Sequence, residues 1–160
     1  LRLVTRLERR YAAFDGLKVQ AELKLGITAQ GKPCGFFDAD VWLRGKADVV
    51  AINGATCFLP DWKTGKVREE PFELEIQAML VHAANPYLTT IKGSYVWLKE
   101  NRMGLTHDLS STNSTWARVN NIVEEIKDCM QSGEWEKKRT PLCAWCDVFD
   151  CENNTNPKIT

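Results

Sequence analysis

The sequence feature that most limits how this chain can fold is a predicted β-hairpin over residues 46–63. Lys46 to Ile52 and Ala55 to Lys63 have the composition of strands, and Asn53-Gly54 between them is a strong signal for a two-residue type I′ turn. Both strands are apolar on both sides near the turn, which is typical of strands inside a sheet. We therefore expect a sheet that is built outward from this hairpin.

Charged residues lie at the end of the hairpin away from its turn. With Asn53-Gly54 as the loop, Asp48 is the diagonal neighbour of Asp61, and side-chain alternation places Lys63 on the same face. Charges beside buried strands cost free energy unless they pair or bind a cation. Pro60 has no N–H, and we expect it at a non-hydrogen-bonded position of the hairpin, with the sheet opening on the other side of its strand.

Two carboxylates and an ammonium group on one face suit metal-assisted hydrolysis. Carboxylate and carbonyl oxygens are hard ligands that favour Mg²⁺ or Mn²⁺, and such an ion activates water and neutralises charge on a phosphate. Lys63 would stabilise the charge that develops on the phosphate or help to position the attacking water. These residues alone leave an alternative open, which is an internal salt bridge between Asp61 and Lys63 in an ordinary hairpin.

The remaining segments alternate between helical and strand patterns. Predicted helices cover residues 1–14, the segment from Pro71 to Asn85-Pro86, and the segment from Ser110 or Ser111 to about Gly133, and predicted strands cover residues 17–27, 41–44, 91–98 and 103–109. The apolar residues of the last helix, from Trp116 to Met130, are expected to face inward. This order predicts an α/β (α+β) fold with a central mixed sheet flanked by helices, in one domain of residues 1–160 whose last part, 137–160, is an irregular tail.

Composition narrows the function. Lys and Arg together number 21, as do Asp and Glu, so the net charge is zero and a nucleic acid would have to be bound by local patches. No apolar run approaches the roughly 18 residues of a membrane span, and no secretory signal is visible. We therefore expect no membrane partner and a cytoplasmic location. The chain begins at Leu1 rather than at Met, so we also expect residues upstream of it.

The cysteines bear on compartment and cofactor. Of the six, Cys143, Cys146 and Cys151 fall within nine residues as C-x₂-C-x₄-C. The C-x₂-C pair has good spacing for metal ligands, and a chain of this length favours a reducing compartment over a disulfide framework.

The charged residues of the hairpin and the helix after it resemble the PD-(D/E)xK nuclease superfamily. The resemblance rests on Gly45-x-x-Asp48, on the run from Asp61 to Gly65 that reads D-x-K-T-G, and on Gln77 in a helix, and it covers roughly residues 20–100. It is most similar to the RecB-type and phage exonuclease branch, which includes the CRISPR-adaptation exonucleases. The resemblance implies a restriction-endonuclease-like core and hydrolysis of DNA with Mg²⁺ or Mn²⁺.

Carried over position by position, the resemblance also implies roles for individual residues. Asp48 and Asp61 become metal ligands, the carbonyl of Trp62 completes part of the metal shell, Lys63 becomes the catalytic lysine, and Gln77 orients the lysine or the DNA. Glu22 on the preceding strand matches a further acidic metal ligand, with a solvent-facing strand residue as the alternative. The tyrosine that the family places four residues after the glutamine is Val81 here, which leaves its contact with DNA unfilled.

The cysteine tail resembles the late ligands of a [4Fe–4S] cluster. Several RecB-type nucleases build such a cluster from one early and three late cysteines, and Cys143, Cys146 and Cys151 match the late three. Cys34 is the best early candidate for the fourth ligand. Zn²⁺ and a metal-free set of thiols remain the alternatives.

The resemblance therefore predicts a metal-dependent DNA exonuclease of phage or bacterial recombination and repair. Its partners would be DNA and, as further candidates, recombination or replication proteins, in the cytoplasm of a bacterium or a phage-infected host. The alternative is an inactive DNA-binding module that keeps the nuclease fold and a cysteine-bound metal. The joint presence of Asp48, Asp61 and Lys63 favours the active enzyme.

Overall fold

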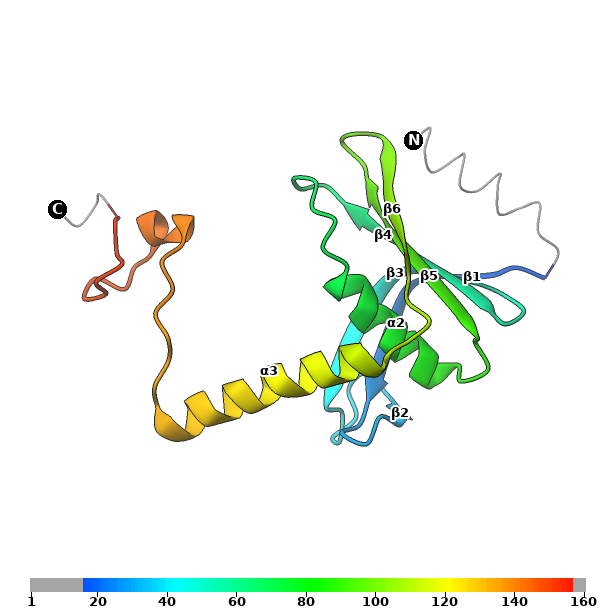
Figure 1. Cartoon of the computed structure of the whole chain (residues 1–160), viewed down its shortest axis with the longest axis horizontal. Coiled ribbons are helices and arrows are strands. Elements are labelled where there is room, and N and C mark those ends of the chain that lie inside the picture. The colour runs from blue at the N-terminus through cyan, green and yellow to red at the C-terminus, as the bar shows by residue number, and fades with distance from the viewer. Residues whose placement is uncertain (1–15, 157–160) are drawn as a thin grey trace. The chain divides into compact units, whose positions relative to one another are not determined.

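The computed structural model describes residues 16–156, so the helix expected over residues 1–14 lies outside the described residues. The elements are β1 (Lys18–Ile27), β2 (Pro33–Cys34), β3 (Leu43–Asn53), β4 (Thr56–Lys63), α2 (Phe72–Ala84), β5 (Thr90–Trp97), β6 (Arg102–Asp108), α3 (Asn113–Ser132) and the 3₁₀ helix η1 (Pro141–Trp145) (Figure 1). The chain divides into two compact units, Leu1–Val119 and Asn120–Thr160. The two short strands expected over residues 41–44 and 46–52 are one continuous strand, β3.

The first unit contains a six-stranded mixed sheet in the order β2-β1-β3-β4-β5-β6. Strands β4 and β5 are parallel, and every other neighbouring pair is antiparallel. Parallel neighbours need a crossover connection, and α2 supplies it by lying across one face of the sheet between them (Figure 1). This arrangement confirms the predicted α/β (α+β) fold and is consistent with a restriction-endonuclease-like core.

The turn of the central hairpin lies one residue later than the sequence predicts. Asn53 pairs with Thr56, so the loop is Gly54-Ala55 and not Asn53-Gly54. Gly54 has a φ of +56°, whereas Ala55 is not among the residues with positive φ. A two-residue turn with glycine first requires only one positive φ, unlike the predicted type I′ turn, which requires two. Continued along both strands, the observed register places Asp48 directly opposite Asp61.

Pro60 explains where the hairpin opens. The β3–β4 ladder runs from Asn53–Thr56 to Ala51–Phe58 and stops there, whereas β4 pairs with β5 along its whole length. Hydrogen-bonded pairs alternate in an antiparallel ladder, so the next one would need the missing N–H of Pro60. The expected opening on the other side of β4 is therefore wrong, because the observed register turns the proline nitrogen towards β3.

The two helices differ in how far they are buried. Helix α2 begins after Pro71 and ends before Asn85, as predicted, and most of its apolar residues are buried. Helix α3 buries only Thr115 and Val119. Its apolar residues beyond Val119, which the sequence predicted to face inward, include three that are exposed, Ile122, Ile126 and Met130. No helix within residues 16–156 is long and apolar enough to cross a membrane.

Replacing Leu74 with alanine is expected to lower the free energy of unfolding by about 2–5 kcal/mol. Leu74 of α2 is fully buried, and its side chain reaches the place where a Cβ on Gly93 of β5 would lie, 3.4 Å away. Truncation leaves a cavity between the crossover helix and the sheet. Urea unfolding measures the change, with Leu105→Ala in the exposed part of β6 as the control. Equal stability of the two variants would show that α2 is not packed as described.

Candidate active site

The strand opening at Pro60 frees a backbone donor for Asp48. Trp62 lies two residues beyond Pro60, so its N–H points to the same side of β4, where the β3 ladder has ended. This N–H donates to Asp48 Oδ2 at 2.9 Å. The carboxylate of Asp48 is thereby held beside the backbone of the residue that follows Asp61.

Asp61 is a buried carboxylate with partners on both oxygens. Its side chain is 4% exposed. Gln77 Nε2–H donates to Oδ1 at 2.9 Å, and Lys63 Nζ lies 2.6 Å from Oδ2 without hydrogen-bond geometry. The crossover explains the first contact, because α2 returns over β4 and brings Gln77 onto a residue sixteen positions earlier in the chain. The glutamine was expected to orient the lysine or the DNA, but its amide holds the aspartate.

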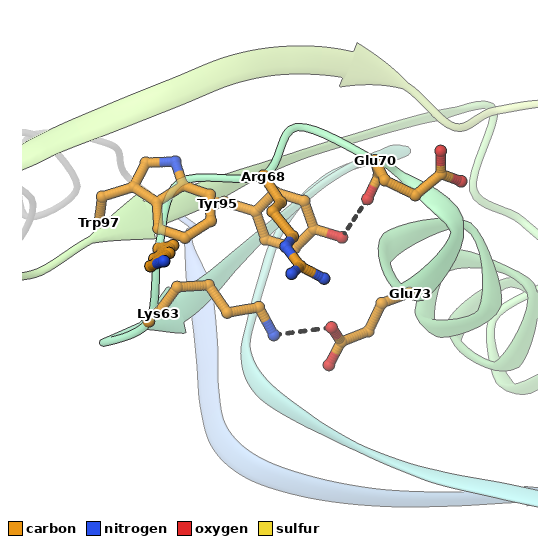
Figure 2. A pocket seen from close by; sticks show the side chains of 8 residues that line it. Lys63, Arg68, Glu70, Glu73, Tyr95 and Trp97 are labelled. Atoms are coloured by element: carbon orange, nitrogen blue, oxygen red, sulfur yellow. Dashed lines mark hydrogen bonds and ion pairs between the residues drawn. The ribbon is translucent and has the colours of Figure 1, made fainter. Parts of the chain in front are cut away.

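Lys63 lies between two carboxylates. Its ammonium contacts Asp61 and also pairs with Glu73 Oε2 at 2.7 Å, as Figure 2 shows for Glu73. Partial burial disfavours the charged form, but the contacts and charges of Asp61 and Glu73 outweigh it and raise the pKa of Lys63. The lysine is therefore a cation at neutral pH, suited to stabilising negative charge rather than to accepting a proton.

Glu73 is the member of this group that sequence reasoning missed. It lies in the first turn of α2, where an acidic residue is ordinary because it interacts favourably with the helix dipole. Its position ten residues after Lys63 has no motif to mark it. Only the return of the crossover helix over the end of β4 brings the two side chains together.

Glu22 is joined to the site less directly. It has a φ of +55°, which is unusual for a residue other than glycine, and its exposed carboxylate pairs with Lys46. Glu22 raises the pKa of Lys46 through its hydrogen bond and its negative charge. Burial lowers this pKa to a smaller extent, and the charge of Asp48 adds a still smaller increase. The structure thus brings Glu22 to a lysine near Asp48.

The donor set fits a hard divalent cation. Asp48 and Asp61 offer carboxylate oxygens from neighbouring strands, and the backbone of Trp62, the residue after Asp61, contacts Asp48. Gln77 Oε1 is buried and has no hydrogen-bond partner within the described residues. Oxygen ligands of this kind suit Mg²⁺ or Mn²⁺. An arrangement of acidic oxygens beside a fixed ammonium group can activate water and stabilise charge on a phosphate.

The structure places the candidate cysteines in both units. Cys143, Cys146 and Cys151 line one cavity of about 290 Å³ in the second unit. Their three sulfurs do not all lie within 4.8 Å of one another. Thiolates bound to a single Zn²⁺, at Zn–S distances of about 2.3 Å, would lie closer together than this. Cys34 belongs to the first unit, and all six cysteines are free.

Polar groups surround Cys34, and hydrogen bonds organise the turns of the tail. Cys34 lies with Asp38 and Asp40 in the one group of three potential ligands that gathers within 4.8 Å among residues 16–156. The tail contains η1, whose capping residue Thr140 accepts from the N–H of Leu142 at 3.2 Å. Asn154 Nδ2 donates to the carbonyls of Cys146 and Val148. Side-chain and backbone hydrogen bonds therefore hold the turns of the tail.

The mixed sheet, the crossover helix and the cluster of two aspartates and a lysine define the kind of site found in metal-dependent nucleases. The family profile of the PD-(D/E)XK nuclease superfamily matches residues 2–151. The chain belongs to this superfamily, whose nucleases typically use a divalent metal ion and act on nucleic acid. A search of curated proteins finds no match.

Proposed function

We propose that the protein is a metal-dependent deoxyribonuclease, and more narrowly an exonuclease of the RecB-type branch. The observation that carries the proposal is the network around Asp61. A buried carboxylate lies against a charged lysine, is held by Gln77, and has a second aspartate fixed on the next backbone amide. A structural salt bridge would need only Asp61 and Lys63. It would not explain why the carboxylate of Asp48 is also held beside them.

Each residue then has a separate task. Asp48 and Asp61 would hold Mg²⁺ or Mn²⁺ with the Trp62 carbonyl, and Glu22 is a candidate for a further ligand. The bound ion would supply water activation and Lewis-acid chemistry. Lys63 stabilises the charge that develops on the phosphate, and Gln77 and Glu73 are positioning residues for Asp61 and Lys63.

Cleavage of labelled DNA tests the proposal. Linear DNA labelled at either the 5′ or the 3′ end, in single- and double-stranded form, is incubated with Mg²⁺, Mn²⁺ or EDTA beside covalently closed circles. An exonuclease degrades the linear substrates with metal, leaves the circles intact and is silent in EDTA. Cleavage of the circles would assign an endonuclease. DNA binding without cleavage in either metal would favour the alternative, an inactive DNA-binding module.

We also propose that Cys143, Cys146 and Cys151 bind a [4Fe–4S] cluster. The support is their lining of one cavity and the C-x₂-C spacing. The cluster would staple the tail rather than take part in hydrolysis. A zinc site is the alternative occupant.

Protein purified without oxygen is expected to be brown and to contain iron and sulfide in equal amounts. Changing Cys146 to serine should bleach the colour, because it removes one thiolate ligand. Cys57→Ala is the matched control, since Cys57 is fully buried in β4 and burial raises its pKa to about 12. Elemental analysis makes the measurement. Colourless protein that contains zinc would assign the alternative, and protein with neither metal would rule out the staple.

The proposed activity fits a role in DNA metabolism. Degradation of DNA from an end would serve phage or bacterial recombination and repair, with recombination or replication proteins as candidate partners. The six free cysteines support a reducing compartment such as the cytoplasm.

A further inference from the structure

A cavity of about 320 Å³ adjoins the catalytic lysine candidate. It lies between the loop after β4, the start of α2 and the end of β5 (Figure 2). The residues that line it are Lys63, Gly65, Lys66, Arg68, Glu70, Glu73, Tyr95 and Trp97. Because Lys63 belongs to both the network and this cavity, any occupant would lie next to the proposed active site.

Two aromatic residues give the cavity an apolar and fixed wall. The hydroxyl of Tyr95 donates to the carbonyl of Glu70 at 2.7 Å, and Trp97 Nε1–H donates to Glu69 at 3.3 Å. Burial, followed by nearby charges, raises the pKa of Tyr95 to about 12, so the phenol stays neutral. Both residues are buried, at 3% exposed each, so their rings close the inner wall of the cavity and leave little surface of their own accessible.

The charges of the cavity leave an excess of positive groups. Its two acidic residues are each matched, Glu70 by Arg118 at 3.2 Å and Glu73 by Lys63 at 2.7 Å. Lys66 and Arg68 are exposed and have no ion-pair partner among residues 16–156. Two unmatched cations at the mouth of a cavity attract a phosphate, and arginine can bind it in a bidentate manner.

We propose that this cavity binds one phosphate-bearing nucleotide of the substrate, the one that adjoins the scissile phosphate. Lys66 and Arg68 would contact its phosphate at the mouth of the cavity, whose inner wall is formed by Tyr95 and Trp97. The inference rests on the proposed nuclease function and adds a substrate subsite to it. The phosphate can be a terminal monoester or an internal diester, and both present the same anionic oxygens.

Binding measured in EDTA tests the subsite without cleavage. A fluorescent single-stranded oligonucleotide is titrated with wild type, with the double variant Lys66→Ala/Arg68→Ala, and with Lys32→Ala as a control in an exposed turn. The double variant is expected to bind about tenfold more weakly and to reduce the slope of log affinity against log salt by about 1–2. Thymidine 5′-monophosphate should displace the oligonucleotide from wild type, and thymidine should not.

A second variant tests shape without removing charge. Gly65 lines the cavity, and a Cβ at this position would meet nothing within 4 Å, so Gly65→Phe adds bulk in open space. It should weaken displacement by the monophosphate. Oligonucleotides with a 5′-phosphate, with a 3′-phosphate or with neither, together with circular single strands, separate the two sources of phosphate. Tighter binding of one phosphorylated end assigns a terminal nucleotide, and equal binding of all four assigns an internal one.

The outcomes separate the subsite from the enzyme. If wild type cleaves DNA while the double variant binds DNA like Lys32→Ala and the monophosphate does not compete, the subsite is wrong and the nuclease proposal stands. If wild type cleaves no DNA but the double variant loses binding, the nuclease proposal fails and the cavity remains a nucleotide-binding site.

Discussion

Replacing Asp61 with asparagine is expected to lower the rate of DNA cleavage by about 10³-fold or more. Asparagine keeps an oxygen to accept from Gln77 Nε2–H, so the contact between α2 and β4 survives. It removes the negative charge that would bind the metal ion. Loss of a metal ligand removes several kcal/mol of transition-state stabilisation, and each 1.36 kcal/mol is a factor of ten in rate. Single-turnover cleavage of labelled DNA in Mg²⁺ measures the effect.

The control for this variant is a carboxylate outside the network. Asp108 at the end of β6 is exposed, and its side chain accepts hydrogen bonds from Ser110. Asp108→Asn should cleave DNA at the wild-type rate. Circular dichroism and thermal unfolding check that Asp61→Asn is folded. A folded Asp61→Asn protein with wild-type activity would remove Asp61 from the site.

Replacing Lys63 with methionine is expected to lower kcat by about 10²–10³-fold, by analogy with other electrostatic donors. Methionine keeps most of the length of the side chain and removes the ammonium group, with its charge and its hydrogen bond to Glu73. Lys63 pairs with both Asp61 and Glu73, so the variant leaves two carboxylates without their shared cation. Saturating DNA in the assay separates this effect on kcat from weaker binding.

Two companion variants locate the effect of the lysine. Lys32→Ala removes an exposed charge elsewhere and should leave kcat unchanged. Glu73→Gln keeps a hydrogen-bond acceptor for Lys63 but removes one charge, so its loss of activity should be smaller than that of Lys63→Met. Wild-type kcat in Lys63→Met would mean that the lysine is only a structural ion-pair partner.

The candidate site residues on β3 and β4 could be predicted from sequence, because side chains along a strand alternate between its two faces with a period of two. Alternation alone places Asp48, Asp61 and Lys63 near one another at one end of the hairpin. The register was wrong because Asn53-Gly54 and Gly54-Ala55 are both acceptable loops with a positive φ at Gly54, and the choice depends on whether Asn53 also adopts a positive φ, which it does not. The error did not change which residues form the site. The predicted register made Asp48 a diagonal neighbour of Asp61, and the observed register makes it a direct one.

Contacts made by the crossover helix were harder to predict. Gln77 was found through a family pattern, but its partner depends on how α2 returns over β4. Glu73 had no local signal at all. The direction in which Pro60 opens the sheet follows from the register, so an error of one loop residue reversed it.

The inward face predicted for α3 failed for another reason. A helical apolar stripe shows which side of a helix can be buried, but not whether another element covers it. Thr115 and Val119 are buried, whereas Ile126 and Met130 are exposed.

The most direct test of the site is the position of a bound metal ion. Crystals of the protein soaked in Mn²⁺ are measured near the manganese absorption edge, and anomalous difference maps locate the ion without reference to activity. We expect a peak between the carboxylates of Asp48 and Asp61, which disappears in crystals of Asp61→Asn. A Mn²⁺ peak only at another place, such as the group formed by Cys34, Asp38 and Asp40, with none between the two aspartates, would contradict the proposed active site.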